Sequence, residues 1–336
     1  MSVVPSAASW PAAHRSPWWL PGGHLQTIWP SLFAQVDDGR PASFRRERWT
    51  TPDQDFIDVD FLEDAANDDP GRPMLVLFHG LEGSSRSGYA RAFACLARAA
   101  GWQYAVPHFR GCSGELNLAP RAYHSGDHEE IDWILGRFAS RRGGPVVAVG
   151  VSLGGNMLLR WAEEWGAEAA HKATTIAAVC SPLDLAAGGH AMGRGFGRHT
   201  YTRMFLHTMK PKALAKLRQH PGLFDGSRLR EASDLYTFDN IFTAPVHGFR
   251  DTEQYWSEAS SKPRLADIRI PSLLLNARND PFVPAQSLPR QHEVGEHVTL
   301  WQPEHGGHVG FAHGGFPGAA LEMPGAVFDW LREHRS

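Results

Sequence analysis

The sequence predicts an α/β fold in which helices cover both faces of a mostly parallel sheet, with a helical cap inserted late in the chain. Three observations lead to this prediction. Continuous apolar stretches, typical of strands buried on both faces, alternate with amphipathic stretches of helical period. A glycine-flanked serine stands between one such strand and the next helix. Residues 183–266 then interrupt the alternation, because they have helical character and no buried strand.

The composition is that of an ordinary globular protein with a large core. The chain has 336 residues, 42% hydrophobic and 21% charged, which allows one large domain or two small ones. Its 33 basic and 36 acidic residues leave a net charge of −3, so nothing indicates a nucleic-acid partner. The three cysteines, Cys95, Cys112 and Cys180, lack CxxC spacing, which favours reduced packing thiols over disulfides or a zinc site.

The N-terminal arm, residues 1–43, is rich in proline, tryptophan and small residues and shows no periodicity. Because tryptophan side chains are seldom left in water, we expect the arm to pack across the body of the domain. The arm lacks the pattern of a secretory signal, and no stretch of the chain approaches the ~18 apolar residues of a membrane span. We therefore expect a cytoplasmic protein.

The predicted elements follow in order after the arm. Residues 44–50 and 56–61 alternate apolar and polar side chains around a turn, which predicts a hairpin or two adjacent strands. After an acidic surface loop at 64–72, buried strands are predicted at 74–78, 102–109, 145–150, 175–179, 272–276 and 298–301. Helical spacing of apolar residues predicts helices at 87–100, 127–142, 155–165 and 321–332. Asp127 is a candidate N-cap, and Arg141 and Arg142 suit the helix dipole.

The stretch Gly150-Val-Ser-Leu-Gly154 predicts a sharp turn from strand to helix. Glycines at 150 and 154 remove Cβ atoms that would clash in so tight a turn, and the turn would hold the Ser152 hydroxyl clear of the sheet as a nucleophile. The N–H of Leu153, at the helix start, would point toward the negative charge that develops on an attacked carbonyl. A plain glycine-rich turn is the alternative interpretation.

An acid and a base for this serine follow two later strands. Asp280 comes directly after the strand at 272–276, and His308 follows the strand ending at 301. The carboxyl ends of parallel strands meet at the edge where Ser152 would emerge, and the chain order Ser, Asp, His is that of α/β-hydrolases. Alternatively, Asp280 forms only an Asx-type turn before Pro281, and His305 competes for the role of base.

Two further possibilities concern the same loops. The N–H of Leu81, in the loop after the strand at 74–78, is the candidate for the second oxyanion donor. A metal site made by His305, His308 and His313 is the weaker hypothesis for the histidine-rich loop, because neither fixed helical spacing nor a paired carboxylate supports it.

With these residues in view, the chain resembles the YheT-like branch of the α/β-hydrolase superfamily, which is related to membrane-linked lipases in animals. The resemblance spans nearly the full length of the chain. It is carried by Gly22-Gly-His-Leu-Gln-Thr-Ile28, His79-Gly-Leu-Glu-Gly-Ser-Ser85, Phe109-Arg-Gly-Cys-Ser-Gly-Glu115, Tyr123-His-Ser-Gly126, Gly150-Val-Ser-Leu-Gly-Gly-Asn156, Phe238-Asp-Asn240 with Phe242-Thr-Ala-Pro245, Asp280-Pro-Phe282 and His305-Gly-Gly-His-Val-Gly-Phe311.

The resemblance implies an α/β-hydrolase fold, a triad of Ser152, Asp280 and His308, hydrolysis of carboxylic esters and no cofactor or metal. Two positions depart from the family pattern: His108 stands where we expect asparagine, and Asn279 stands where relatives usually carry aspartate. The second departure removes a rival for the role of triad acid.

Other residues of the shared motifs are expected to be structural. We expect Arg110 and Glu115 to form an ion pair across their loop, and His124 to be a hydrogen-bonding structural histidine. Asp239 and Asn240 lie in the insertion, and we expect them to hold the cap onto the body.

The predicted domains are a hydrolase core, residues 1–182 and 267–336, and a helical cap, residues 183–266. No acidic residue lies between Asp184 and Asp225, whereas seven residues there are basic: Arg194, Arg198, Arg203, Lys210, Lys212, Lys216 and Arg218. Tyr201, Met204, Phe205 and Thr208 fall on one helical face, and Pro211 suits the first turn of a second helix. Either the charges are simply solvated, or this cap is a basic amphipathic lid that touches anionic lipid or an anionic acyl ester.

The sequence therefore predicts a serine esterase or lipase-like enzyme that acts on a small acyl ester. A carboxylate nucleophile, as in epoxide and haloalkane hydrolysis, is excluded by the serine at the turn, and no nucleotide-binding pattern is present. The alternative is a non-catalytic ligand- or lipid-binding protein on the same scaffold.

Overall fold

In a computed structural model of the chain, eight strands form one sheet in the order β1-β2-β4-β3-β5-β6-β7-β8. The structure describes residues 14–36, 39–63, 69, 71–141 and 143–335. The first 13 residues of the arm, most of the loop at 64–72 and Arg142 therefore lie outside the described residues.

The strands form where continuous or alternating apolar stretches predicted them. They are β1 (Phe44–Thr50), β2 (Phe56–Leu62), β3 (Met74–Phe78), β4 (Gln103–Pro107), β5 (Val146–Val151), β6 (Thr175–Val179), β7 (Ser272–Leu275) and β8 (Val298–Trp301). β1 and β2 form an antiparallel hairpin, β2 pairs antiparallel with β4, and the other neighbouring strands are parallel. The predicted α/β fold with a mostly parallel sheet is thus confirmed.

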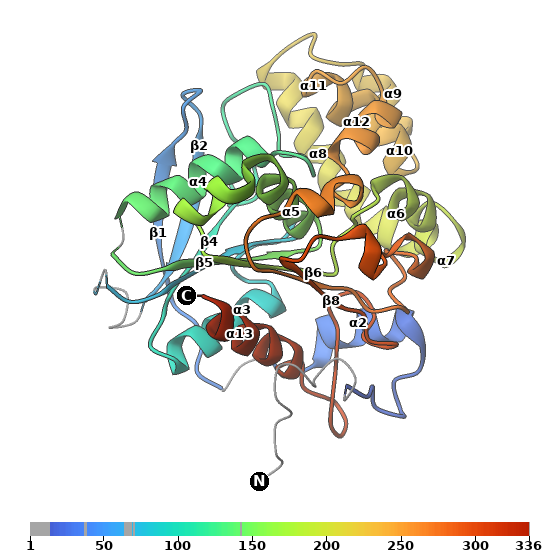
Figure 1. Ribbon diagram of the computed structural model, residues 1–336. Coiled ribbons are helices and arrows are strands. Elements are labelled where there is room, and N and C mark those ends of the chain that lie inside the picture. The colour runs from blue at the N-terminus through green and yellow to red at the C-terminus, as the bar shows by residue number, and fades with distance from the viewer. Residues whose placement is uncertain (1–13, 37–38, 64–68, 70, 142, 336) are drawn as a thin grey trace.

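Helices cover both faces of this sheet (Figure 1). On one face lie α4 (His128–Arg141) and α5 (Leu153–Trp165), and on the other α3 (Gly88–Ala99) and α13 (Glu322–His334). Successive side chains of a strand point to opposite faces, so Val76 of β3 joins the core beneath α4 and α5, whereas Leu77 joins the core beneath α3 and α13. Because both faces of the central strands are buried, strands such as β3 and β5 are continuously apolar.

Between β6 and β7 the chain forms a series of helices that gather at one end of the sheet (Figure 1). They are α6 (Leu185–Met192), α7 (Gly195–Gly197), η3 (Arg198–Thr202), α8 (Arg203–Gln219), α9 (Gly226–Glu231), α10 (Leu235–Phe238), η4 (Asp239–Thr243), α11 (Ala244–Val246), α12 (Thr252–Ala259) and η5 (Lys262–Asp267). We call residues 183–266 the inserted helices. They have a hydrophobic cluster of their own, centred on Leu206, Leu229 and Phe238.

Two expectations about this insertion were wrong. α8 continues through Pro211 rather than starting a second helix there, because a proline removes only one backbone bond of a helix that is 17 residues long. The expected apolar face is also shifted, since Met204 and Thr208 are exposed while Leu206 and Ala213 are buried.

The arm contains a helix, α2 (Gly22–Phe33), that the sequence pattern did not predict. Its apolar side chains do not follow one buried stripe, because Leu25, Leu32 and Phe33 are exposed while the polar Gln26 and Thr27 are buried. Three short turns, η2 (Gly166–His171), η6 (Ala285–Ser287) and η7 (Gln291–Glu293), complete the described elements. No helix among the described residues is both long enough and apolar enough to cross a bilayer.

Candidate active site

Ser152 occupies the sharp turn between β5 and α5. Its backbone φ is 53°, in the left-handed region that residues with a side chain seldom adopt. A Cβ atom on Gly150 would lie 2.5 Å from the carbonyl oxygen of Gly154, and a Cβ on Gly154 would lie 2.5 Å from the carbonyl oxygen of Phe78. The glycines therefore let the turn close on itself and approach the end of β3. The predicted strand, sharp turn and helix are confirmed.

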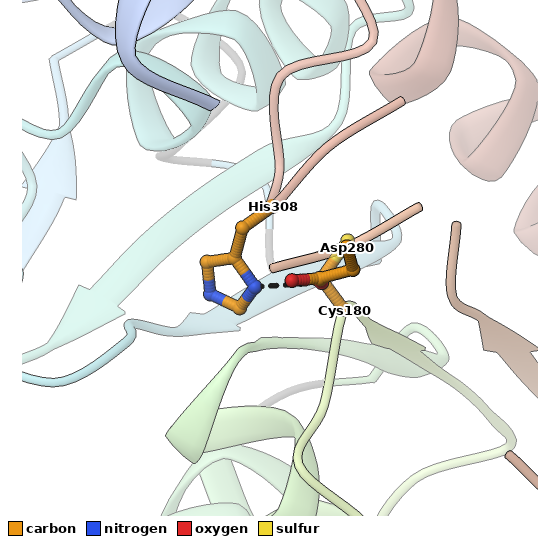
Figure 2. A group of neighbouring side chains, drawn as sticks. All are labelled: Cys180, Asp280 and His308. Carbon is orange, nitrogen blue, oxygen red and sulfur yellow. Dashed lines mark hydrogen bonds and ion pairs between the residues drawn. The ribbon is translucent and has the colours of Figure 1, made fainter. Parts of the chain in front are cut away.

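The loops after β5, β7 and β8 bring Ser152, His308 and Asp280 into one hydrogen-bonded chain. The Ser152 hydroxyl lies 2.9 Å from Nε2 of His308. Nδ1 of the same ring lies 2.8 Å from Oδ2 of Asp280, the contact that Figure 2 shows. Because a carboxylate only accepts, a neutral His308 carries its proton on Nδ1 and accepts the hydroxyl proton at Nε2. This arrangement can pass the Ser152 proton to Nε2 of His308, while the buried Asp280 carboxylate stabilises the imidazolium that forms.

Asp280 holds its position through a second set of contacts. Its Oδ1 accepts the N–H groups of Phe282, at 2.7 Å, and Val283, at 3.3 Å. The Asx-type turn and the contact with His308 are therefore both present, one on each oxygen. The Phe282 ring also stacks on the imidazole of His308, with ring centroids 4.1 Å apart.

His305, the competing histidine, is exposed and does not reach Ser152. The Asn279 side-chain amide lies 3.4 Å from its Nδ1. Among the described residues, the group of His, Cys, Asp and Glu side chains close enough to share a metal is Cys180, Asp280 and His308, which does not include His305 or His313. The three histidines of the metal hypothesis do not converge.

Cys180 lies beside Asp280 (Figure 2) and was expected only to fill space. Its sulfur accepts the N–H of Val309 at 3.3 Å, so it also supports the loop that carries His308. Burial and the neighbouring Asp280 carboxylate raise the pKa of this thiol well above its usual value, which keeps it protonated.

The N–H groups of Leu81 and Leu153 belong to residues that line the same cavity as Ser152. Among the residues that the structure describes, no acceptor binds either N–H group. Two backbone donors without partners, next to a hydroxyl that can attack, are the elements from which an oxyanion hole is made.

The loop that carries Leu81 is fixed by two tyrosines. The N–H of Gly80 donates to the Tyr89 hydroxyl at 2.9 Å, and the N–H of Glu82 donates to the Tyr123 hydroxyl at 3.0 Å. The Tyr123 hydroxyl in turn donates to the Glu82 carboxylate at 2.9 Å. With its neighbours held on both sides, the Leu81 N–H has a defined position.

Two buried histidines near this loop are neutral. His79 donates from Nδ1 to the carbonyl oxygen of Gly80 and accepts the N–H of Phe109 at Nε2. His124 accepts the N–H of Gly126 at 3.3 Å, which confirms it as a hydrogen-bonding structural histidine. Burial lowers the pKa of both rings to about 3.

A cavity of about 150 Å³ opens beside Ser152 and His308. The inserted helices supply most of its apolar wall, and the core closes the other side. The apolar lining consists of Leu81, Leu116, Leu153, Leu185, Met192, Phe205, Met209, Leu235, Phe238, Phe242, Trp256 and Phe282.

Arg110 and Glu115 do not pair with each other as predicted. Arg110 is buried and binds Asp55 at 2.7 Å and Glu130 at 2.6 Å, whereas Glu115 binds Arg48 at 2.6 Å. Both residues therefore form ion pairs with residues outside the motif. These partners lie far away in the sequence, so the motif alone could not predict them.

Asp239 and Asn240 were expected to join the cap to the body, and this was wrong. Asp239 accepts the Trp256 indole N–H at 2.9 Å, and Asn240 accepts the N–H of Thr252 at 3.2 Å. All four residues belong to the inserted helices, which these bonds hold to one another. Burial raises the pKa of Asp239, which faces the cavity, to about 6.

Two lysines are among the residues that link the inserted helices to the body. Lys212 pairs with the Glu82 carboxylate at 2.9 Å. Lys216 is buried and donates to the carbonyl oxygen of Ala119 at 2.9 Å, and burial lowers its pKa to about 8. The basic stretch is therefore divided, because these lysines point inward while Arg194, Arg198, Arg203 and Arg218 are exposed.

Helix α2 positions the loop of His308, a role that sequence reasoning missed. The Gln26 side-chain oxygen accepts the N–H of Gly306 at 3.0 Å, and the Thr27 hydroxyl accepts the N–H of His308 at 2.8 Å. A Cβ on Gly310 would lie 1.7 Å from the Gln26 carbonyl oxygen, so the loop passes very close to the helix. The signal was present in the motif at 22–28, which was interpreted as packing.

Comparisons with known proteins agree with this architecture. Residues 73–314 match the family described as alpha/beta hydrolase fold. The chain is 38% identical over 312 residues to the protein named "Putative esterase YheT" from Escherichia coli (strain K12), which covers 92% of this chain and 89% of that one. It is 28% identical over 287 residues to "Phospholipase ABHD3" of Mus musculus, covering 82% and 68% of the two chains.

A yeast lipase and a solved esterase structure are also similar to this chain. The "Monoacylglycerol lipase" of Saccharomyces cerevisiae is 28% identical over 256 residues, covering 73% of this chain and 56% of that one. The solved esterase Pf2001 of Pyrococcus furiosus shares the fold, with a TM-score of 0.54 at 14% identity over 90% of this chain and 98% of that one. The chain therefore belongs to the α/β-hydrolase family, among its YheT-like, esterase- and lipase-related members.

Proposed function

We propose that the protein is a serine hydrolase that cleaves carboxylic esters of short- to medium-chain acyl groups or acyl lipids. The observation that carries this proposal is the hydrogen-bonded chain from Ser152 through His308 to Asp280 at the edge of the cavity. A serine, a histidine and a carboxylate in this order form the relay that activates a hydroxyl for attack on a carbonyl.

In the proposed mechanism, the Ser152 oxygen attacks the acyl carbonyl while its proton passes to Nε2 of His308. Asp280 holds the imidazole through Nδ1 and stabilises the imidazolium that forms. The N–H groups of Leu81 and Leu153 bind the oxyanion. His308 then protonates the leaving alkoxide, and water, activated by the same ring, releases the acid from the acyl-enzyme and restores Ser152.

The substrate class is inferred from the cavity. Its wall is mostly apolar, which suits an acyl chain better than a sugar or a nucleotide. Relatives carry the names "Putative esterase", "Phospholipase" and "Monoacylglycerol lipase", and each of these names denotes hydrolysis of an ester.

The test is hydrolysis of p-nitrophenyl esters of graded acyl length, together with covalent labelling of the serine by a fluorophosphonate probe. Ser152→Ala should remove labelling and lower kcat by about 10⁴- to 10⁶-fold without changing the fold, because the hydroxyl is outside the core. His308→Ala should be nearly as damaging.

His305→Ala is the matched control, because it removes an exposed ring from the same loop and should retain most of kcat. Turnover of Ser152→Ala like that of the wild type would refute the nucleophile, and a reversed ranking of the histidines would move the base to His305. A wild type inert to every ester and to the probe would favour the non-catalytic binding protein.

A further inference from the structure

Large exposed apolar side chains gather on three short segments of the surface. The described residues expose eight such side chains, and seven of them lie in α2 and the turn before it, at the start of the inserted helices, or in the loop after His313. Single exposed apolar residues are ordinary, but a contiguous group marks a contact surface. We call this group the apolar rim: Trp18, Leu25, Leu32, Phe33, Phe196, Met204 and Phe316.

Aromatic contacts join these segments into one surface. The Trp29 ring lies 4.5 Å from Phe33 and 5.3 Å from Phe316, measured between ring centroids. On the other side of α2, His24 lies 4.6 Å from Phe196. Segments distant in the sequence therefore meet around α2, and Figure 1 shows this helix near α7.

The apolar rim is close to the candidate base. Nδ1 of His24 lies 3.1 Å from the Tyr201 hydroxyl, and the Tyr201 ring packs edge-on against Phe282 at 4.5 Å. Phe282 in turn stacks on His308. A surface that engages Phe196, whose ring contacts His24, is therefore connected to the candidate base through packed rings.

The charged side chains carried by the segments of the rim have one sign. Residues 14–36, 185–224 and 313–321, which build this surface, contain no aspartate or glutamate. Five arginines on these segments, Arg15, Arg194, Arg198, Arg203 and Arg218, are exposed. Apolar and tryptophan side chains beside cations match the headgroup layer of an anionic membrane, where tryptophan is favoured and cations are attracted. A second copy docked by the same patch would instead bring like charges together.

We propose that the apolar rim docks the protein on anionic lipid, with the cavity beside it. The proposal rests on the proposed function, since it assigns that site a substrate presented at a lipid surface. The lipid contact differs from the one expected of the basic cap, because Lys212 and Lys216 point inward. The proposed contact surface is instead formed by α2, the start of the inserted helices and the loop at 313–319.

The experiment measures co-sedimentation of the full chain with vesicles of phosphatidylcholine, with and without phosphatidylglycerol. The wild type should bind the anionic vesicles more strongly, and salt should weaken this preference. The combined variant Trp18→Ser, Leu25→Gln, Leu32→Gln should bind about 10-fold more weakly, while its kcat/KM for p-nitrophenyl butyrate stays within about 2-fold of the wild type.

Leu118→Gln is the control matched to Leu32→Gln, because the two leucines are 58% and 65% exposed but only Leu32 belongs to the rim. Equal binding of the combined variant and the wild type, or no binding of the wild type to either vesicle, would overturn the proposal. A wild-type dimer that the combined variant dissociates would assign the rim to a second copy instead. Failure of the proposed function would appear separately, as a wild type inactive on p-nitrophenyl butyrate.

Discussion

Asn279 illustrates how one side chain can connect distant segments. Its side-chain amide donates to Gln26 at 2.8 Å, and its Oδ1 accepts the N–H of Gly307 at 3.0 Å. A carboxylate only accepts, so an aspartate here could not donate to the Gln26 oxygen. The asparagine that departs from the family pattern at this position therefore bonds to both α2 and the loop of His308.

Asp239→Asn tests how a buried carboxyl group at the cavity affects the stability of the fold at different pH values. Burial raises the pKa of Asp239 to about 6, against about 3.9 in an unfolded chain. The folded protein therefore holds this proton more tightly, and its stability falls as the pH rises from about 4 to 6. Asparagine is neutral throughout and can still accept the Trp256 N–H, so the variant should gain about 1–3 kcal/mol relative to the wild type above pH 6.

The measurement is Tm by calorimetry for both proteins between pH 4 and pH 8. The two values should coincide near pH 4 and diverge through pH 6, with the variant higher. A difference that is constant over this range would show that Asp239 is ionised, or equally solvated, in both states.

At the scale of the element, α2 is a support for the candidate base. Thr27→Val removes the acceptor of the His308 N–H but keeps the shape of the side chain. We expect kcat to fall by about 10-fold with KM little changed, because small displacements of a reacting group reduce the rate steeply.

Thr208→Val is the matched control for this experiment. Both threonines donate to a carbonyl of their own helix, but Thr208 is exposed, whereas the Thr27 hydroxyl also accepts the N–H of His308. Equal kcat values for wild type and Thr27→Val, measured on p-nitrophenyl butyrate, would limit α2 to a packing role.

Elements differ in how far their sequences predict them. The strands were predictable because burial on both faces leaves an unbroken apolar run, as in Met74–Phe78. α2 was not, because its exposed leucines and buried Gln26 oppose the usual helical pattern. The proximity of Ser152, Asp280 and His308 was predictable because each follows its own strand, whereas the partners of Arg110 depend on contacts that no local pattern encodes.

At the scale of the whole molecule, one ion pair links the inserted helices to the candidate oxyanion loop. Lys212 binds Glu82, the residue after Leu81, whereas Lys210 on the same helix donates to the Arg230 carbonyl oxygen within the insertion. Lys212→Met should lower kcat/KM by about 10-fold, since the Glu82 carboxylate loses its cationic partner, while the free energy of unfolding changes by less than about 1 kcal/mol.

Lys210→Met, which removes the same charge two residues away, should leave kcat/KM near the wild-type value. Steady-state kinetics on esters of two acyl lengths and urea unfolding of each variant make the comparison. An equal loss of kcat/KM in the two variants would show that the effect comes from the net charge and not from the ion pair between the inserted helices and the body.

The contacts of α2 with the loop of His308 join residues 280 and 281 positions apart. During synthesis on the ribosome, Ser152 is made long before His308. The Gln26 and Thr27 side-chain oxygens of α2 can accept the N–H groups of that loop only after it has been made. Under the proposed mechanism, a chain released early contains the nucleophile without its base. Incomplete synthesis would then yield a fragment without esterase activity. Ester cleavage would begin only after α2 and the loop of His308 have packed together.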